Sequence, residues 1–138
     1  MFDFREMKTN DHENSIELWK QTEGMGFLES DTIESLSFYL QRNPGMSFVC
    51  YDEKKLIGTI LGGHDGRRGY IYHLAVDKNY RGKSIGKKFI ELSLERIKAS
   101  GIKRCIIMLK SDNEANGEFW LKSGFERRED LNMFSKDL

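Results

Sequence analysis

One stretch of nine residues, 80–88, constrains the fold of this 138-residue chain more than any other. Its sequence is Tyr-Arg-Gly-Lys-Ser-Ile-Gly-Lys-Lys, and it joins an apolar run at 70–76, which predicts a β-strand, to an amphipathic segment at 85–99, which predicts a helix. A turn that leads from a strand into a helix N-terminus can bind anions, because the first N–H groups of the helix have no internal acceptor and the helix dipole adds partial positive charge. Four cationic side chains lie in the same stretch: Arg81, Lys83, Lys87 and Lys88. The stretch therefore predicts a pyrophosphate site.

The glycine spacing argues against two common phosphate-binding motifs. A P-loop has four residues between its glycines, followed by Lys and Ser/Thr, whereas Gly82 and Gly86 are separated by three residues and Lys88 occupies the Ser/Thr position. The dinucleotide-binding motif G-x-G-x-x-G also fails, because its spacing is absent and no early strand carries it. The stretch fits Arg/Gln-x-x-Gly-x-Gly/Ala through Arg81, Ser84 and Gly86, with serine in place of the first glycine. An ordinary helix start with solvated lysines fits this stretch equally well.

Composition limits the class of ligand. The chain has 22 basic and 22 acidic residues and a formal net charge of zero, so no overall field attracts nucleic acid or a membrane surface. Cys50 and Cys105 lie in apolar runs, as expected for buried free thiols in a reducing compartment, and they indicate neither a disulfide framework nor a metal site. The first residues do not resemble a signal peptide, and no apolar run has the length of a membrane span. These features predict a cytoplasmic protein that binds no metal, nucleic acid or membrane.

The hydrophobic pattern predicts a single α/β domain over residues 1–138. Helices are expected after a cap at Asn10 or Asp11, after a capping box formed by Asp31 and Glu34, at 85–99 and at 113–122. Strands are expected at 2–7, 46–51, 56–62, 70–76 and 104–109, with two weaker strands at 125–129 and 132–135. The strand–helix–strand unit around residues 80–88 implies one parallel pair, because such a crossover returns the chain in the same direction.

This order of elements resembles the fold of the GNAT (Gcn-related N-acetyltransferase) superfamily over essentially the whole chain. That fold is a mixed twisted sheet with the order strand, two helices, three strands, helix, strand, helix and two strands. Leu74-Ala75-Val76-Asp77 resembles the end of the family's fourth strand. A later segment is similar to the family pattern N-x-x-A-x-x-aromatic-Tyr-x-x-x-G-F, through Asn113, Asn116, Phe119, Trp120, Gly124 and Phe125. The run at 62–69 further resembles the small bacterial YpeA-like branch.

The resemblance implies that acetyl-CoA lies between the fourth and fifth strands as a co-substrate. Its pantetheine arm would pair with the backbone of Leu74, Ala75 and Val76, and Asn113, Phe119 and Trp120 would complete the cofactor site. Its pyrophosphate would meet the backbone of seven consecutive residues: Arg81, Gly82, Lys83, Ser84, Ile85, Gly86 and Lys87. An amine would then attack the thioester directly, and a backbone N–H near residues 74–76 would stabilise the oxyanion of the tetrahedral intermediate.

Two departures from the family pattern affect these expectations. Ser84 replaces a glycine, which keeps the backbone donor and adds a hydroxyl but also crowds the approach of a phosphate. Trp120 replaces a tyrosine that protonates the leaving thiolate in many members, and an indole N–H does not release a proton near neutral pH. Trp120 is therefore expected to pack rather than to act as an acid. The missing acid also keeps open a second function, a non-catalytic acyl-CoA binding or sensing module.

The general base has several candidates. His73 would titrate near neutrality, although a histidine hydrogen-bonded within a central strand is the simpler interpretation. Strand alternation places Tyr72 on the opposite face from His73. Glu23 and Glu29 lie in the loop that shapes the acceptor side in this family, while Asp31 is expected only to cap a helix. The acceptor itself, a small-molecule or peptide amine, and a homodimer are left open by the sequence.

Overall fold

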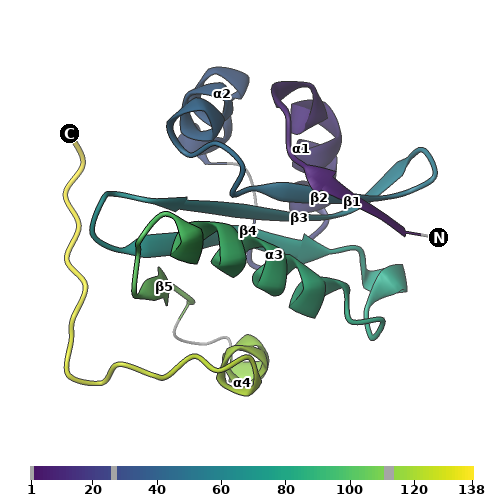
Figure 1. Ribbon diagram of the computed structural model, residues 1–138. Coiled ribbons are helices and arrows are strands. Elements are labelled where there is room, and N and C mark those ends of the chain that lie inside the picture. The colour runs from purple at the N-terminus through teal and green to yellow at the C-terminus, as the bar shows by residue number, and fades with distance from the viewer. Residues whose placement is uncertain (1, 26–27, 111–113) are drawn as a thin grey trace. The chain divides into compact units, whose positions relative to one another are not determined.

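The chain is organised around a five-stranded sheet in which the strands lie in sequence order (Figure 1). The strands are β1 (Phe2–Glu6), β2 (Phe48–Asp52), β3 (Lys55–His64), β4 (Gly69–Val76) and β5 (Cys105–Ile107). Neighbouring strands pair antiparallel from β1 to β4, and β5 pairs parallel to β4. The computed structural model describes residues 2–25, 28–110 and 114–138. The mixed sheet and its parallel pair agree with the prediction.

Two helices cover one face of the sheet, and a third covers the other (Figure 1). On the first face lie α1 (His12–Lys20) and α2 (Ile33–Arg42), and on the second lies α3 (Ile85–Ala99). Three single-turn 3-10 helices connect these elements: η1 (Thr9–Asp11), η2 (Glu29–Asp31) and η3 (Lys78–Tyr80). Among the helices described, none has the length and apolar character needed to cross a bilayer.

Glycines in β3 bring the sheet and α3 close together. Successive strand residues point to opposite faces, so Gly58 and Gly62 face α3 while Thr59 and Gly63 face α1 and α2. A Cβ built on Gly62 would clash with the Ser93 hydroxyl and lie 2.5 Å from the Met46 carbonyl oxygen. Ser93 is itself fixed, because its hydroxyl donates to that same carbonyl at 2.8 Å. The close approach of α3 to β3 therefore requires glycine at this position.

Residues 1–108 and 109–138 form two compact units, and each is described by itself. The second unit contains α4 (Glu114–Lys122), in which the Trp120 ring lies edge-on to Phe125 at 5.0 Å between centroids. A backbone hydrogen bond links the same two residues, because Phe125 N–H donates to the Trp120 carbonyl at 3.0 Å. The single domain expected over residues 1–138 stays a prediction.

The two weak strands expected at 125–129 and 132–135 are not formed in the structure, and that prediction was wrong. A strand needs a neighbour for its backbone groups, and the described part of this unit contains no other strand to provide one. Charged side chains interrupt the apolar alternation, and Arg128 pairs locally with Asp130, at 3.1 Å for each of two hydrogen bonds. The segment after α4 therefore carries exposed apolar side chains, among them Met133 and Phe134.

Replacing Gly62 with alanine should destabilise the fold by about 2–3 kcal/mol, because overpacking a close backbone contact displaces α3 from β3. Urea denaturation followed by circular dichroism measures this loss. Gly117→Ala is the matched control, since a Cβ there meets only the Arg127 side chain at an ordinary 3.6 Å. Equal midpoints for the two variants would contradict the assigned packing.

Candidate active site

The centre of the candidate site is a bulge in β4. Thr59 pairs with Ala75 and Leu61 pairs with Tyr72, so His73 and Leu74 together lie opposite a single residue of β3, Ile60. His73 takes a φ of +46°, a left-handed conformation that is uncommon for residues other than glycine. The regular alternation of β4 is therefore broken at this residue.

The bulge changes the direction of two aromatic side chains. The His73 ring lies 4.4 Å from the ring of Trp19 on α1, and the Tyr72 ring lies 6.3 Å from that of Tyr39 on α2. Both helices cover the same face of the sheet (Figure 1). The expectation that Tyr72 and His73 point to opposite faces was wrong, because strict alternation does not hold across a bulge.

A buried chain of hydrogen bonds holds the bulge. Trp19 Nε1–H donates to the Thr59 hydroxyl oxygen at 2.9 Å, and that hydroxyl donates to the His73 carbonyl at 2.8 Å. Trp19 and Thr59 are fully buried. The conformation of His73 is thus fixed through β3 by a side chain of α1.

Beyond the bulge, one edge of β4 has no strand beside it in the described residues. β5 pairs only with Gly69, Tyr70 and Ile71, so Leu74, Ala75 and Val76 extend past the last pair. Asp77 N–H donates to the Ile57 carbonyl on β3 at 2.8 Å. Because N–H groups alternate in direction along a strand, Val76 N–H points to the free edge. This edge can accept an extended ligand as an additional strand.

The free edge leads directly into the turn that the sequence marked as an anion site. Gly82 and Ser84 take positive φ values of +80° and +64°, and α3 begins at Ile85. The first hydrogen bond of the helix runs from Lys88 N–H to the Ser84 carbonyl at 3.1 Å. The N–H groups of residues 85–87 therefore have no acceptor within the helix. Lys83 and Lys87 are exposed beside these donors. Backbone donors and cations therefore converge at the end of β4.

Arg81 connects this turn to the free edge of β4. Its Nε donates to the Val76 carbonyl at 3.1 Å, and its guanidinium lies 3.6 Å from the carboxylate of Glu23. Both side chains are largely exposed, so this ion pair is weak and exchanges readily for another anion. Glu23 is thereby placed beside the turn, whereas Glu29 is exposed at the first position of η2.

The carboxylate that reaches His73 belongs to Asp31. Its Oδ1 lies 2.8 Å from His73 Nε2, and the Asp31 side chain is only 3% exposed. The expectation that Asp31 caps α2 was wrong: the N-cap is Thr32, whose hydroxyl oxygen accepts from Ser35 N–H at 3.2 Å. No periodicity joins two residues so far apart in the chain, so the sequence offered no signal for this pair.

Three other predicted residues, at positions 113, 119 and 120, fall within the second unit. Phe119 and Trp120 lie on α4, with their rings edge-on at 5.5 Å, and Trp120 also packs on Phe125. Trp120 thus packs against aromatic neighbours, as expected, and its lack of an acid role stays a prediction. Asn113 lies outside the described residues.

The cysteines do not provide a nucleophile. Burial raises the pKa of the Cys50 and Cys105 thiols to about 11, so neither is a thiolate near neutral pH. No histidine pairs with either thiol in the part of the chain that the structure describes. Among the same residues, no cluster of His, Cys, Asp or Glu has the arrangement of a metal site. The chemistry of this site must therefore come from other groups.

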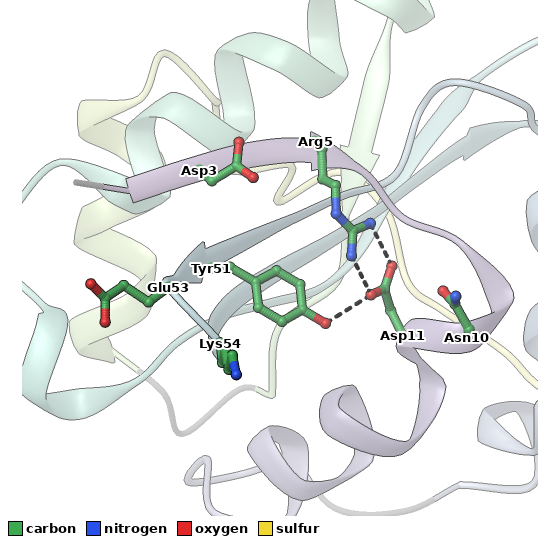
Figure 2. Close-up of a pocket in the computed structure, with 7 residues that line it drawn as sticks. All are labelled: Asp3, Arg5, Asn10, Asp11, Tyr51, Glu53 and Lys54. Carbon is green, nitrogen blue, oxygen red and sulfur yellow. Dashed lines mark hydrogen bonds and ion pairs between the residues drawn. The ribbon is translucent and has the colours of Figure 1, made fainter.

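A separate pocket of about 400 Å³ lies beside β1 and the β2–β3 turn (Figure 2). At its wall, Asp11 accepts two hydrogen bonds from Arg5, at 2.7 and 2.9 Å, and one from the Tyr51 hydroxyl at 2.8 Å. Desolvation opposes ionisation of Asp11, but these bonds and one from Lys8 N–H outweigh it and lower its pKa. The carboxylate is thus occupied by its own chain, and its network joins β1 to β2.

Known proteins share both the sequence pattern and the fold. The sequence model of the acetyltransferase (GNAT) family matches residues 11–125. An acetyltransferase of Sodalis glossinidius is 26% identical over 136 residues, covering 99% of this chain and 95% of the relative. N-alpha-acetyltransferase 30 of Schizosaccharomyces pombe is 34% identical over 110 residues, covering 72% of this chain and 73% of the relative. The structure of PaiA N-acetyltransferase from Thermoplasma acidophilum in complex with coenzyme A matches with a TM-score of 0.78 at 21% identity, covering 94% and 92% of the two chains.

Replacing Ser84 with glycine should stabilise the protein by about 0.5–1 kcal/mol, because a serine in the left-handed region is strained and glycine is not. Thermal or urea unfolding measures the change. Ser100→Gly, at the other end of α3 with a φ of −81°, relieves no such strain and should not stabilise. A loss of stability in Ser84→Gly as large as that in Ser100→Gly would show that the turn is unstrained.

Proposed function

Because the chain belongs to the GNAT acetyltransferase family and is an acyltransferase, we propose that it is an acetyl-CoA-dependent N-acetyltransferase that moves the acetyl group directly to a primary amine. One observation carries this proposal: the free edge of β4 is followed, after η3 and the turn at 81–84, by the donor-rich N-terminus of α3. An extended arm that ends in a pyrophosphate fits this sequence of features. The acceptor, a small-molecule or peptide amine, is proposed at the level of its chemical class.

In this proposal, the pantetheine arm lies along Leu74, Ala75 and Val76, with Val76 N–H donating to one of its carbonyl oxygens. The pyrophosphate accepts from the backbone of residues 81–87 and from the exposed lysines of the turn. Arg81 is then free to leave the exposed carboxylate of Glu23 for a phosphate oxygen, since the two negative groups compete for the same guanidinium. In this proposal Glu23 pairs with Arg81 when no cofactor is bound, and it does not take a proton from the amine.

The reaction forms one C–N bond and breaks one C–S bond. A neutral amine attacks the thioester carbon, and a backbone N–H at the bulge stabilises the oxyanion of the tetrahedral intermediate. His73 takes the proton that the amine nitrogen must lose, because its ring lies at the bulge where the thioester ends. Collapse of the intermediate then releases the coenzyme A thiolate, whose thiol has an ordinary pKa near ~8.5, so departure needs no dedicated acid.

A cytoplasmic location, membership of the YpeA-like branch and a homodimer also remain predictions. None of them is needed for the proposed chemistry.

The direct test is acceptor-dependent thiol release from acetyl-CoA, followed with a thiol reagent over a panel of amines and peptides. Cys50 and Cys105 should add little background, since burial keeps both protonated. Lys87→Ala should raise the KM for acetyl-CoA about fivefold, the loss of ~1 kcal/mol of charge interaction with the pyrophosphate.

Lys98→Ala is the matched control, because Lys98 is an exposed lysine in the last turn of the same helix. Its KM should equal that of the wild type. Acetyl-CoA binding without release for any acceptor would favour the binding module instead. An equal rise in KM for Lys87→Ala and Lys98→Ala would argue against a pyrophosphate at the start of α3.

A further inference from the structure

The contact between Asp31 and His73 is more specific than an ordinary surface ion pair. Asp31 Oδ1 lies 2.8 Å from His73 Nε2, and Asp31 Oδ2 accepts from Leu28 N–H at 3.0 Å. The Asp31 and His73 side chains are 3% and 13% exposed. The carboxylate therefore has both oxygens engaged and is held in one orientation.

The backbone around Asp31 is also fixed. Asp31 N–H donates to the Leu28 carbonyl at 2.9 Å, and the Asp31 carbonyl lies 2.7 Å from His12 Nε2 on α1. On the other side of the pair, Trp19 and Thr59 hold the ring and the carbonyl of His73. Both partners are thus positioned from several elements, which leaves little freedom in the distance between them.

The Asp31–His73 pair is not explained by a contribution to the stability of the fold. The capping of α2 is already done by Thr32, so Asp31 is not needed for it. A buried ion pair contributes little net stability, since the cost of desolvating the charges offsets their attraction. The strained φ of +46° at His73 adds a further cost. The arrangement therefore favours a role in which the orientation and charge of the imidazole matter.

The pair decides which ring nitrogen is free. An ionised carboxylate only accepts hydrogen bonds, so Nε2 must carry a proton and Nδ1 of the neutral ring carries a lone pair. In the described residues no hydrogen bond involves Nδ1, and this nitrogen is also not among the buried side-chain atoms that lack a partner. The His73 side chain is 13% exposed, and Nδ1 holds the lone pair that can accept a proton.

We propose that Asp31 is the positioning residue of the base His73, an inference that rests on the proposed function. As the amine nitrogen bonds to the thioester carbon, its proton passes to Nδ1, and the carboxylate of Asp31 stabilises the imidazolium that forms. The C–S bond then breaks, the thiolate leaves, and Nδ1 returns its proton to the thiolate or to water. No other reactant is required. The step uses Asp31 for its charge and for fixing the tautomer.

The titratable groups around the ring come from three elements. η2 contributes Asp31, α1 contributes His12 through the Asp31 carbonyl, and β4 contributes Tyr72, which burial makes a weaker acid by raising its pKa. β3 contributes the uncharged Thr59. A pH effect at His73 should therefore depend mainly on the charge of Asp31.

The test is the nearly isosteric Asp31→Asn, with Glu34→Gln, an exposed acid in the first turn of α2, as matched control. Asp31→Asn should lower kcat about 10²-fold, since the general base loses its orientation and charge partner. The KM for acetyl-CoA should change by less than twofold. The acidic limb of the pH–rate profile should move to lower pH, because the imidazolium is no longer stabilised. Glu34→Gln should match the wild type in all three measurements.

A second measurement does not depend on turnover. Nitrogen-15 NMR of the His73 ring should find the proton of the neutral form on Nε2 in the wild type, and its titration should follow the acidic limb of the profile. A proton on Nδ1, or an unchanged kcat and profile in a folded Asp31→Asn protein, would overturn this proposal alone. Wild-type protein that releases no thiol with any acceptor would overturn the proposed function, and this catalytic role with it.

Discussion

The hydrogen-bond chain from Trp19 through Thr59 to the His73 carbonyl is the interaction on which the site depends. Its Trp19 and Thr59 members are fully buried, and the chain joins α1, β3 and β4, so the bulge in β4 is tied to the core. These hydrogen bonds stabilise the bulge, in which two residues of β4 lie opposite one residue of β3. The core thus determines where the candidate base is.

Backbone strain is concentrated around the free edge of β4. Within the described residues, three non-glycine positions have positive φ: Glu53 in a hairpin turn, His73 at the bulge and Ser84 at the start of α3. Each left-handed residue costs on the order of 1–2 kcal/mol. His73 directly precedes the Leu74–Val76 edge, and Ser84 ends the anion turn that follows this edge after η3. This distribution suggests that the strain is tolerated because it shapes one continuous binding surface.

Local features of the site were predictable from sequence, but long-range ones were not. α3 was predicted at its observed bounds, because helical periodicity and glycines at both ends are local signals. The contact between Asp31 and His73 could not be predicted, since it depends on a bulge and on the packing of η2 against β4. The sequence favoured Glu23 and Glu29 as candidate bases and assigned Asp31 only to a cap, and the fold shows that Asp31 is the acid in contact with His73. The strands expected after α4 failed for a similar reason, because a strand exists only with a neighbour.

The two halves of the proposed chemistry come from different parts of the first unit. The turn after β4 supplies the charges and backbone donors for a pyrophosphate, and α1, β3 and η2 together fix the ring that would take the proton. They meet along Leu74, Ala75 and Val76, where the arm of the cofactor would connect them. A protein that kept the turn and lost the bulge should therefore still bind the cofactor but transfer the acetyl group slowly.

The most direct test of the central claim is amide hydrogen exchange, residue by residue, with and without coenzyme A. If the cofactor adds to the free edge of β4, exchange at Val76 should slow more than about tenfold on binding, while exchange at Ile71, which already lies between β3 and β5, should be unchanged. Saturating coenzyme A that leaves Val76 unprotected, or that protects residues around the pocket at Asp11 and Tyr51 instead, would contradict this account of where the cofactor lies.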